Sequence, residues 1–304
     1  MSVLKMKILR ILALSFLMSS KIFIKIGRVI GKFSHEAFGD VIQNIGINES
    51  TKYNMLGTES EIYYLDKYWQ ILGKYLGVLS AGDLILDLGC SQGRFAHRLA
   101  VEHPKVKIKG IDLSQRAIDY ARDNSPKNSE NLEFQVQTIR ECLSAQADNS
   151  VSVIIMTEVT VFYPDWIKDI PDIQRCLRPG GLFIITFRSR YYNLLHCIGN
   201  DNWEALPDIL EKDEGFLFGN PTKFQWKDKF QVSEILEGTM GFHLDEIYGI
   251  GGCSGIDGDP FARITMPENL NKDQKDLLGQ AEEKIGRMIP DASRYMLAIS
   301  SKSV

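Results

Sequence analysis

The sequence lacks the features that mark several common classes of protein. Its five cysteines are scattered without any C-x-x-C pair, so neither a zinc site nor a disulfide framework is indicated. Its net charge of -4 lacks the basic excess with which general nucleic-acid binders meet phosphates. We therefore expect no nucleic-acid partner. Scattered thiols suit a reducing compartment, so we also expect a cytoplasmic protein.

What is present is the composition of a globular protein. The chain has 304 residues, of which 44% are hydrophobic and 24% are charged. Such a chain can bury one large core, or one core with an appended subdomain. A chain of this length has little room for two unrelated large domains.

The first 35 residues form a basic and apolar arm. They contain seven basic residues and no acidic one. Helical periodicity places most of these basic residues in one narrow sector beside a broad apolar surface. The longest uncharged run of the arm, residues 11–20, is shorter than the roughly 20 residues that span a bilayer. Three interpretations are open: a helix packed on the domain or over its active site, a helix on a membrane surface, or a cleaved or targeting segment.

From residue 80 onward, short apolar runs alternate with helical patterns. The strand-like runs are residues 83–89, 106–114, 132–137, 151–158, 181–187, 241–251 and 294–302, and the helical patterns are residues 93–103, 114–124 and 164–177. Repeated βα units predict an α/β fold, with a mostly parallel, doubly wound sheet of seven strands covered on both faces. In such sheets the ligand lies beyond the carboxyl ends of the strands.

The segment LDLGCSQGRF, residues 86–95, links the first of these strands to its helix. Its glycines, Gly89 and Gly93, permit backbone angles and a close ligand approach that a Cβ would obstruct. Their spacing differs from the G-x-G-x-x-G fingerprint that binds the pyrophosphate of a dinucleotide. Asp87, at the end of the strand, is also a poor neighbour for a phosphate. The loop therefore favours a positively charged ligand, such as an amino group or a sulfonium.

A second acidic residue, Asp112, ends the next strand in GIDLS, where a carboxylate can accept hydrogen bonds from both hydroxyls of a ribose. A ribose without a phosphate fits S-adenosylmethionine. Together, LDLGCSQGRF, GIDLS and LRPGGLFIITF resemble the successive motifs of class I S-adenosylmethionine-dependent methyltransferases, in particular the small-molecule, type 11-like branch. The resemblance covers roughly residues 80–190 and implies a Rossmann-like fold whose last strand is antiparallel.

The resemblance also implies which residues meet the cofactor. They are Asp87, Gly89, Ser91 and Gly93 around its methionine part, Cys90 in the same loop, Asp112 on the ribose, Leu113, Thr138 and Ile139 beside the adenine, and Thr157 at the junction with the acceptor. Two positions depart from the family pattern. Ser91 stands where the family often has glycine, and Thr138 stands where many members have an aspartate, which accepts a hydrogen bond more strongly than a hydroxyl.

Methyl transfer from a sulfonium mainly requires alignment, exclusion of water and removal of a proton. Residues 188–242, rich in aromatic side chains, are expected to roof the acceptor pocket, or merely to build a small subdomain core. His196 in this insertion is the best candidate for a general base, and Tyr191 and Glu158 are weaker ones. No metal site is expected.

We thus predict four regions: an N-terminal helical arm or cap (1–79), an S-adenosylmethionine-binding core (80–187), an acceptor-side insertion (188–242) and a C-terminal completion of the sheet (243–304). The predicted function is methylation of a small, hydrophobic metabolite on oxygen, nitrogen or carbon. Two alternatives stay open. One is a nucleotide-dependent oxidoreductase, and the other is a non-catalytic protein that binds a membrane surface or a partner through the arm.

Overall fold

The computed structural model of the protein describes residues 55–217, 223–256 and 265–303. The basic arm of residues 1–35 lies outside these ranges, and so does most of the predicted N-terminal cap. The three interpretations of the arm therefore stay predictions.

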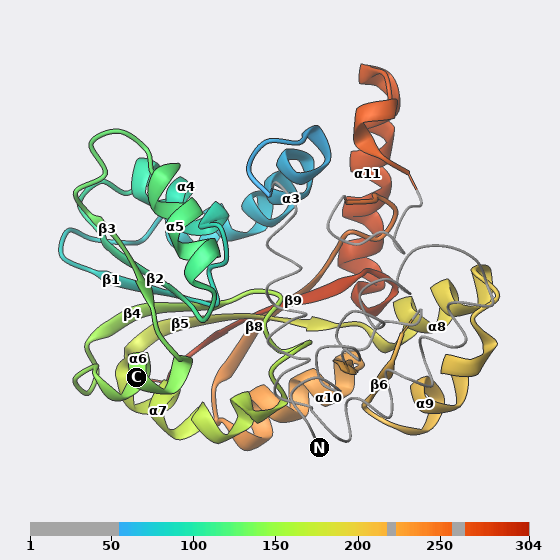
Figure 1. The fold of residues 1–304 in the computed structure, drawn as a ribbon. Helices are drawn as coiled ribbons and strands as arrows, with labels where there is room; N and C mark the ends of the chain where they lie inside the picture. Colours follow the sequence, from blue (N-terminus) through green and yellow to red (C-terminus); the bar gives the residue numbers. More distant parts are fainter. Residues whose placement is uncertain (1–54, 218–222, 257–264, 304) are drawn as a thin grey trace, which may run out of the picture.

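A seven-stranded sheet forms the centre of the molecule, with the order β3-β2-β1-β4-β5-β9-β8 (Figure 1). Its strands are β1 (Leu84–Leu88), β2 (Lys107–Asp112), β3 (Leu132–Val136), β4 (Val151–Met156), β5 (Leu177–Arg188), β8 (His243–Ile250) and β9 (Tyr295–Ser301). Strands β1 to β5 pair in parallel, and β9 pairs antiparallel with both β5 and β8. The strand order reverses between β1 and β4. All seven predicted strands and the antiparallel last strand are confirmed.

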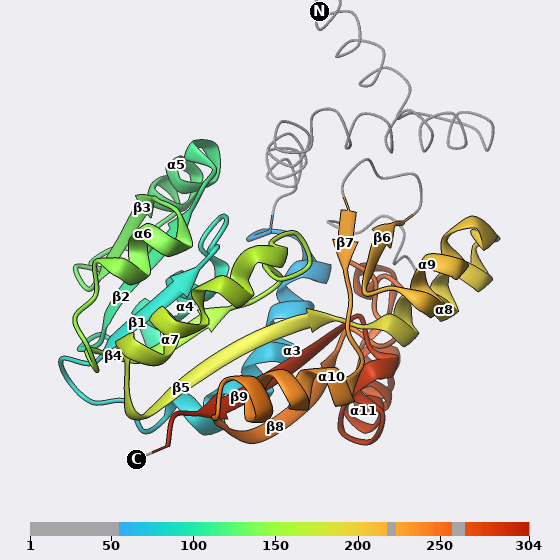
Figure 2. The same ribbon diagram turned by 90° about the horizontal axis from the view of Figure 1, so that it is seen from below.

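Helices cover both faces of the sheet (Figures 1 and 2). One face carries α3 (Glu59–Leu76), α4 (Arg94–Glu102), α5 (Gln115–Asp123) and α11 (Lys272–Met288), and the other carries α6 (Ile139–Ser144), the 3-10 helix η1 (Pro164–Asp169), α7 (Ile170–Cys176), α10 (Lys229–Ser233) and the π-helix η3 (Glu234–Thr239). Each face buries its own apolar cluster against the sheet. No described helix combines the length and apolar character needed to cross a membrane.

The chain between β5 and α10 folds beyond the carboxyl end of β5 (Figure 1). It contains α8 (Arg190–Gly199), η2 (Trp203–Ala205), α9 (Leu206–Glu211), β6 (Glu214–Phe216) and β7 (Lys223–Gln225), and two short 3-10 helices, η4 (Pro267–Asn269) and η5 (Pro290–Ala292), follow later in the chain. Five of its side chains, including Trp226 and Ile209, form a third small apolar cluster. The insertion thus has a local core, as one of the two interpretations expected, but among its aromatic residues only Trp226 and the partly buried Phe224 belong to that core, whereas Trp203 and Phe230 are exposed.

Local sequence signals explain several element ends. Ser114 caps α5, since its hydroxyl accepts from the Ala117 N–H. β5 begins at Leu177, before the predicted run of residues 181–187, and this start is irregular. Val151 pairs with Leu177 and Val153 pairs with Leu182, so residues 178–181 are left out of the ladder.

Candidate active site

The loop between β1 and α4 is held in a tight turn by its own backbone. The N–H groups of Gly89 and Cys90 donate to the Ile111 carbonyl of β2, at 2.8 and 2.9 Å. Gly89, Ser91 and Gly93 have φ values of 78°, 47° and 81°. These angles favour glycine, because a Cβ crowds the backbone at positive φ. Ser91, where the family often has glycine, is accommodated in the same left-handed region.

Asp112 closes this loop from the neighbouring strand. One carboxylate oxygen, Oδ2, accepts from the Ser91 N–H at 3.0 Å, and the other, Oδ1, accepts from the Ser114 N–H at 2.8 Å. Burial raises the pKa of this carboxyl group above its ordinary value, and the backbone donors oppose that rise. Each carboxylate oxygen can accept more than one hydrogen bond, so the group can still receive ribose hydroxyls.

Asp87 is deeply buried at this end of the sheet, with 1% of its surface exposed. Its Oδ2 is buried and has no hydrogen-bond partner among the residues that the structure describes. Burial raises the pKa of Asp87 to about 7, although the positive charge of Arg94 opposes the rise. A buried acceptor without a donor is costly. A ligand that supplies a donor or a positive charge here would remove that cost.

The side chains predicted to flank the adenine lie at the carboxyl ends of β2 and β3. Leu113 is 53% exposed and Val136 is 41% exposed, which leaves apolar surface available at this rim. Ile139 is half-buried against the core. The Thr138 hydroxyl caps α6, because it accepts from the Glu141 N–H and donates to the Glu141 carboxylate at 2.7 Å. The predicted contact of Thr138 with adenine would therefore use the same hydroxyl oxygen that already accepts the capping hydrogen bond.

Cys90 is a buried thiol in the same loop. Burial raises its pKa well above the ordinary value, and the carboxylates of Asp87 and Asp112 add to the rise. The thiol therefore stays protonated, which does not suit a nucleophile. The side chain packs into the core beside α4.

A buried ion network, which the sequence analysis did not predict, joins the loop to α3 and to the turn after β4. Arg94, the first residue of α4, pairs with Glu158 at 2.6 Å and with Glu61 of α3 at 3.3 Å. The Tyr68 hydroxyl of α3 donates to the same Glu158 at 3.0 Å. Thr157, which precedes Glu158, is 8% exposed. The structure thus surrounds the predicted junction residues with groups from three separate elements.

A pocket opens between the core and the insertion, at the carboxyl ends of β4 and β5. It is lined by Thr160, Pro164, Trp166, Ile167, Phe187, Arg188, Gln225, Trp226 and Lys227. Trp166 packs edge-on against Phe187, with ring centroids 5.7 Å apart. The Gln225 N–H donates to the Val161 carbonyl at 2.9 Å, which fastens β7 to the turn after β4. The insertion therefore supplies one wall of this pocket.

The two other predicted catalytic side chains lie on α8. Tyr191 is 43% exposed, and His196 is half-buried and stacked on the Tyr192 ring, with centroids 4.0 Å apart. Neither side chain is among those that line the pocket. Their role as bases stays a prediction.

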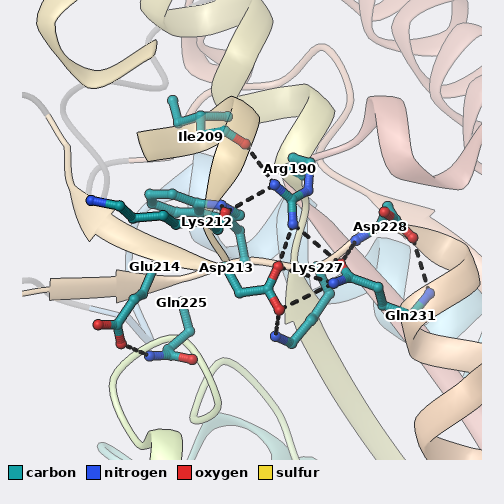
Figure 3. A network of polar contacts seen from close by, with 10 residues as sticks. Arg190, Ile209, Lys212, Asp213, Glu214, Gln225, Lys227, Asp228 and Gln231 are labelled. Atoms are coloured by element: carbon teal, nitrogen blue, oxygen red, sulfur yellow. Dashed lines mark hydrogen bonds and ion pairs between the residues drawn. The ribbon is translucent and has the colours of Figure 1, made fainter. Parts of the chain in front are cut away.

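The insertion has its own polar network, which Figure 3 shows from close by. Asp213 binds the guanidinium of Arg190 and accepts from Lys227 at 2.7 Å. Gln231 donates to both carboxylate oxygens of Asp213, at 2.9 and 3.1 Å. Arg190 also donates to the Ile209 carbonyl at 2.6 Å. These bonds fasten α8, α9 and α10 to one another at the edge of the sheet.

The chain is similar in sequence to known methyltransferases. A family model described as a methyltransferase domain matches residues 79–235. An arsenite methyltransferase of Halobacterium salinarum is 34% identical over 116 residues, which are 37% of this chain and 29% of that protein. A ubiquinone biosynthesis O-methyltransferase of Coxiella burnetii is 30% identical over 118 residues, which are 38% of this chain and 49% of that protein. The chain thus spans less than half the length of these curated relatives.

Solved structures show the same fold at low sequence identity. The phosphoethanolamine N-methyltransferase 2 of Haemonchus contortus, in complex with S-adenosyl-L-methionine, has a TM-score of 0.52 and 20% identity. The match covers 79% of this chain and 53% of that one. Because the family model matches half of the chain and includes the glycine loop, Asp112 and β5, the chain belongs to the methyltransferase domain family.

Proposed function

We propose that the protein is an S-adenosylmethionine-dependent methyltransferase that acts on a small, hydrophobic metabolite. The observation that carries the proposal is the pair of carboxylates at the carboxyl ends of two neighbouring strands. Asp87 ends β1 with a buried, unpartnered oxygen, and Asp112 ends β2 beside the loop. Both would repel a phosphate, and both suit a ligand that carries cationic groups and a free ribose.

The residues fit S-adenosylmethionine part by part. Asp87 and the turn of Gly89 to Gly93 would hold the methionine end, and Asp112 would hold the ribose hydroxyls. Leu113 and Ile139 would cover the faces of the adenine. When bound, the cofactor supplies a methyl group activated by a positively charged sulfur. The protein's own contribution is to align the acceptor and exclude water.

The composition of the pocket wall beside the insertion is our basis for a hydrophobic acceptor, since it includes Trp166, Phe187 and Trp226. These three side chains are only 1–3% exposed, so they offer an acceptor little of their own surface. Polar groups at the edge of the pocket, such as Thr160 and Gln225, could orient such a molecule. A methyltransferase of this kind needs cofactor and acceptor sites at the same edge of the sheet, and both regions lie there.

Titration calorimetry with S-adenosylhomocysteine and, separately, with NAD tests the proposal. We expect S-adenosylhomocysteine to bind and NAD not to bind. The opposite result would favour a nucleotide-dependent oxidoreductase, which the glycine spacing and the antiparallel β9 disfavour. Incubating metabolite extracts with methyl-labelled cofactor would then identify the acceptor, and binding without transfer of label would favour a non-catalytic protein.

The predicted membrane contact belongs to the basic arm, and we propose it as a separate property of the enzyme. Removal of residues 1–35 should leave the affinity for S-adenosylhomocysteine unchanged, since the proposed cofactor residues follow residue 80. Sedimentation with anionic liposomes should be lost in that variant, and in the full chain it should weaken as salt rises. Equal sedimentation of both chains would reject the membrane contact.

A further inference from the structure

The turn after β4 holds Glu158 in an uncommon backbone conformation. Its φ is 61°, in the left-handed region that side chains other than glycine rarely adopt. The Glu158 N–H donates to the Thr186 hydroxyl of β5 at 2.6 Å, which fixes the turn. Such strain costs on the order of 1–3 kcal/mol and persists where the surroundings demand one arrangement. The position of this carboxylate is therefore set by its neighbours.

Within the described ranges, the polar contacts of the Glu158 side chain involve one of its two carboxylate oxygens. Arg94 Nη2 and the Tyr68 hydroxyl both donate to Oε1, at 2.6 and 3.0 Å. Among the described residues, no hydrogen bond or ion pair reaches the other oxygen, Oε2. The Glu158 side chain is 19% exposed, whereas that of Arg94 is 9% exposed. The carboxylate is thus held through Oε1 by two donors from the interior, and its side chain keeps 19% of its surface exposed.

Arg94 is itself fixed in place by α3. Glu61, whose side chain is 1% exposed, pairs with its guanidinium at 3.3 Å. The rings of Tyr64 and Phe95 lie 5.5 and 5.4 Å from the guanidinium carbon. A buried guanidinium that lost one of these carboxylates would leave an uncompensated charge. These contacts hold the side chain of Arg94 in one position. Arg94 directly follows Gly93 of the loop.

We propose that Glu158 directs Oε2 into the junction between cofactor and acceptor, and that Arg94 and Tyr68 are positioning residues that fix the carboxylate by its other oxygen. This inference rests on the proposed function. It favours acceptors that carry a proton on the attacking atom, namely hydroxyl or N–H compounds. As the acceptor's lone pair forms the bond to the methyl carbon, the electrons of the breaking C–S bond stay on sulfur. The acceptor's proton moves to Oε2, and the carboxylate becomes a carboxyl group.

The test uses two cofactor analogues and needs no acceptor. Sinefungin carries an amine at the place of the transferred methyl group, whereas S-adenosylhomocysteine has nothing there. A carboxylate that faces the junction should bind the sinefungin ammonium, so the wild-type protein should prefer sinefungin. Loss of one charge-assisted hydrogen bond in Glu158→Gln should reduce that preference about tenfold. Tyr68→Phe removes only a positioning contact and should reduce it about threefold.

Tyr75→Phe is a matched control on the same helix. The Tyr75 hydroxyl donates to Glu246 of β8 at 2.9 Å, away from the network, so this variant should keep the full preference for sinefungin. Unchanged binding of S-adenosylhomocysteine in each variant would show that the fold and the cofactor loop are intact.

The outcomes separate this inference from the proposed function. If the wild-type protein binds neither analogue, the proposed function fails. If it binds both but Glu158→Gln keeps the ratio of the two affinities, Glu158 does not face the junction, while the proposed function stands. If Glu158→Gln and Tyr68→Phe weaken the binding of both analogues equally, the network only supports the fold, and the inference is wrong.

Discussion

The cofactor loop and the insertion meet the same edge of the sheet, but they hold their charges differently. At the end of β1, Asp87 keeps a buried oxygen that no group in the described part of the chain contacts by a hydrogen bond. In the insertion, Asp213 is surrounded by Arg190, Lys227 and Gln231, which satisfy both of its oxygens (Figure 3). A buried group left unsatisfied is a cost that a ligand can remove, whereas a satisfied network contributes to folding. The difference is consistent with cofactor binding at the loop and with a supporting role for the Asp213 network of the insertion.

The largest expected effect is at Gly89. A Cβ here would overlap the Val159 side chain, and the φ of 78° is unfavourable for a branched residue. Gly89→Val should weaken binding of S-adenosylhomocysteine by about 3 kcal/mol or more, which is at least about a hundredfold. Gly82→Val is the control, because Gly82 has a φ of 90° but open space around it. It should lower stability without changing the affinity. Normal binding by Gly89→Val would remove the loop from the cofactor site.

Asp112→Ala should have the next largest effect. Loss of the bonds that its carboxylate makes to ribose hydroxyls should weaken S-adenosylhomocysteine binding by about 1.5–3 kcal/mol. Calorimetry measures the change. Asp119→Ala, on the exposed side of α5, is the matched control and should bind as the wild type does. An unchanged affinity in folded Asp112→Ala would place the ribose elsewhere.

The raised pKa of Asp87 predicts a pH dependence that the insertion should not share. The folded-state pKa is about 7, and the ordinary value is 3.8. Between these values the unfolded chain loses a proton from Asp87 that the folded, ligand-free protein keeps, so the contribution of Asp87 to the free energy of unfolding should fall as pH rises from about 4 to 7. A cationic ligand favours the ionised form. The affinity for S-adenosylmethionine should therefore rise by up to about tenfold per pH unit below pH 7 and level off above it.

Calorimetry across this pH range, in buffers of different ionisation enthalpy, checks the proton release that should accompany binding. Asp87→Asn is the control and should abolish the pH dependence and the proton release near pH 7, while any contribution from the raised pKa of Asp112 remains. If the wild-type affinity is constant from pH 5 to 8, Asp87 does not ionise on binding.

The smallest effect is expected in the insertion. Asp213→Asn removes the charge that joins Arg190 to Lys227 and should lower the free energy of unfolding by about 1 kcal/mol, because the network is partly exposed. Binding of S-adenosylhomocysteine should not change. Asp165→Asn, in an exposed pair with Lys168, should cost less than about 0.5 kcal/mol. A loss of cofactor affinity in Asp213→Asn would contradict the division between a binding loop and a supporting insertion.

Most of the fold could be predicted because its signals are local. The runs at residues 132–137 and 151–158 became β3 (Leu132–Val136) and β4 (Val151–Met156) almost without change. The capping role of Thr138 could also be predicted from the sequence. Its T-x-x-E pattern with Glu141 is the signature of a capping box, which competes with a role toward adenine. The irregular start of β5 was harder to predict from the sequence, because residues 178–181 have the composition of a turn but lie inside a strand.

The sequence by itself determined the alternating strands and helices, the glycine turn and the two carboxylates at the strand ends. Each of these depends on periodicity or backbone angles within a few residues. Only the tertiary structure decided that Arg94 joins Glu61 to Glu158, which stand 33 and 64 residues away. Nothing near any one of these residues specifies its partners. A buried guanidinium must find carboxylates wherever packing brings them, and that packing is a property of the folded sheet and its helices.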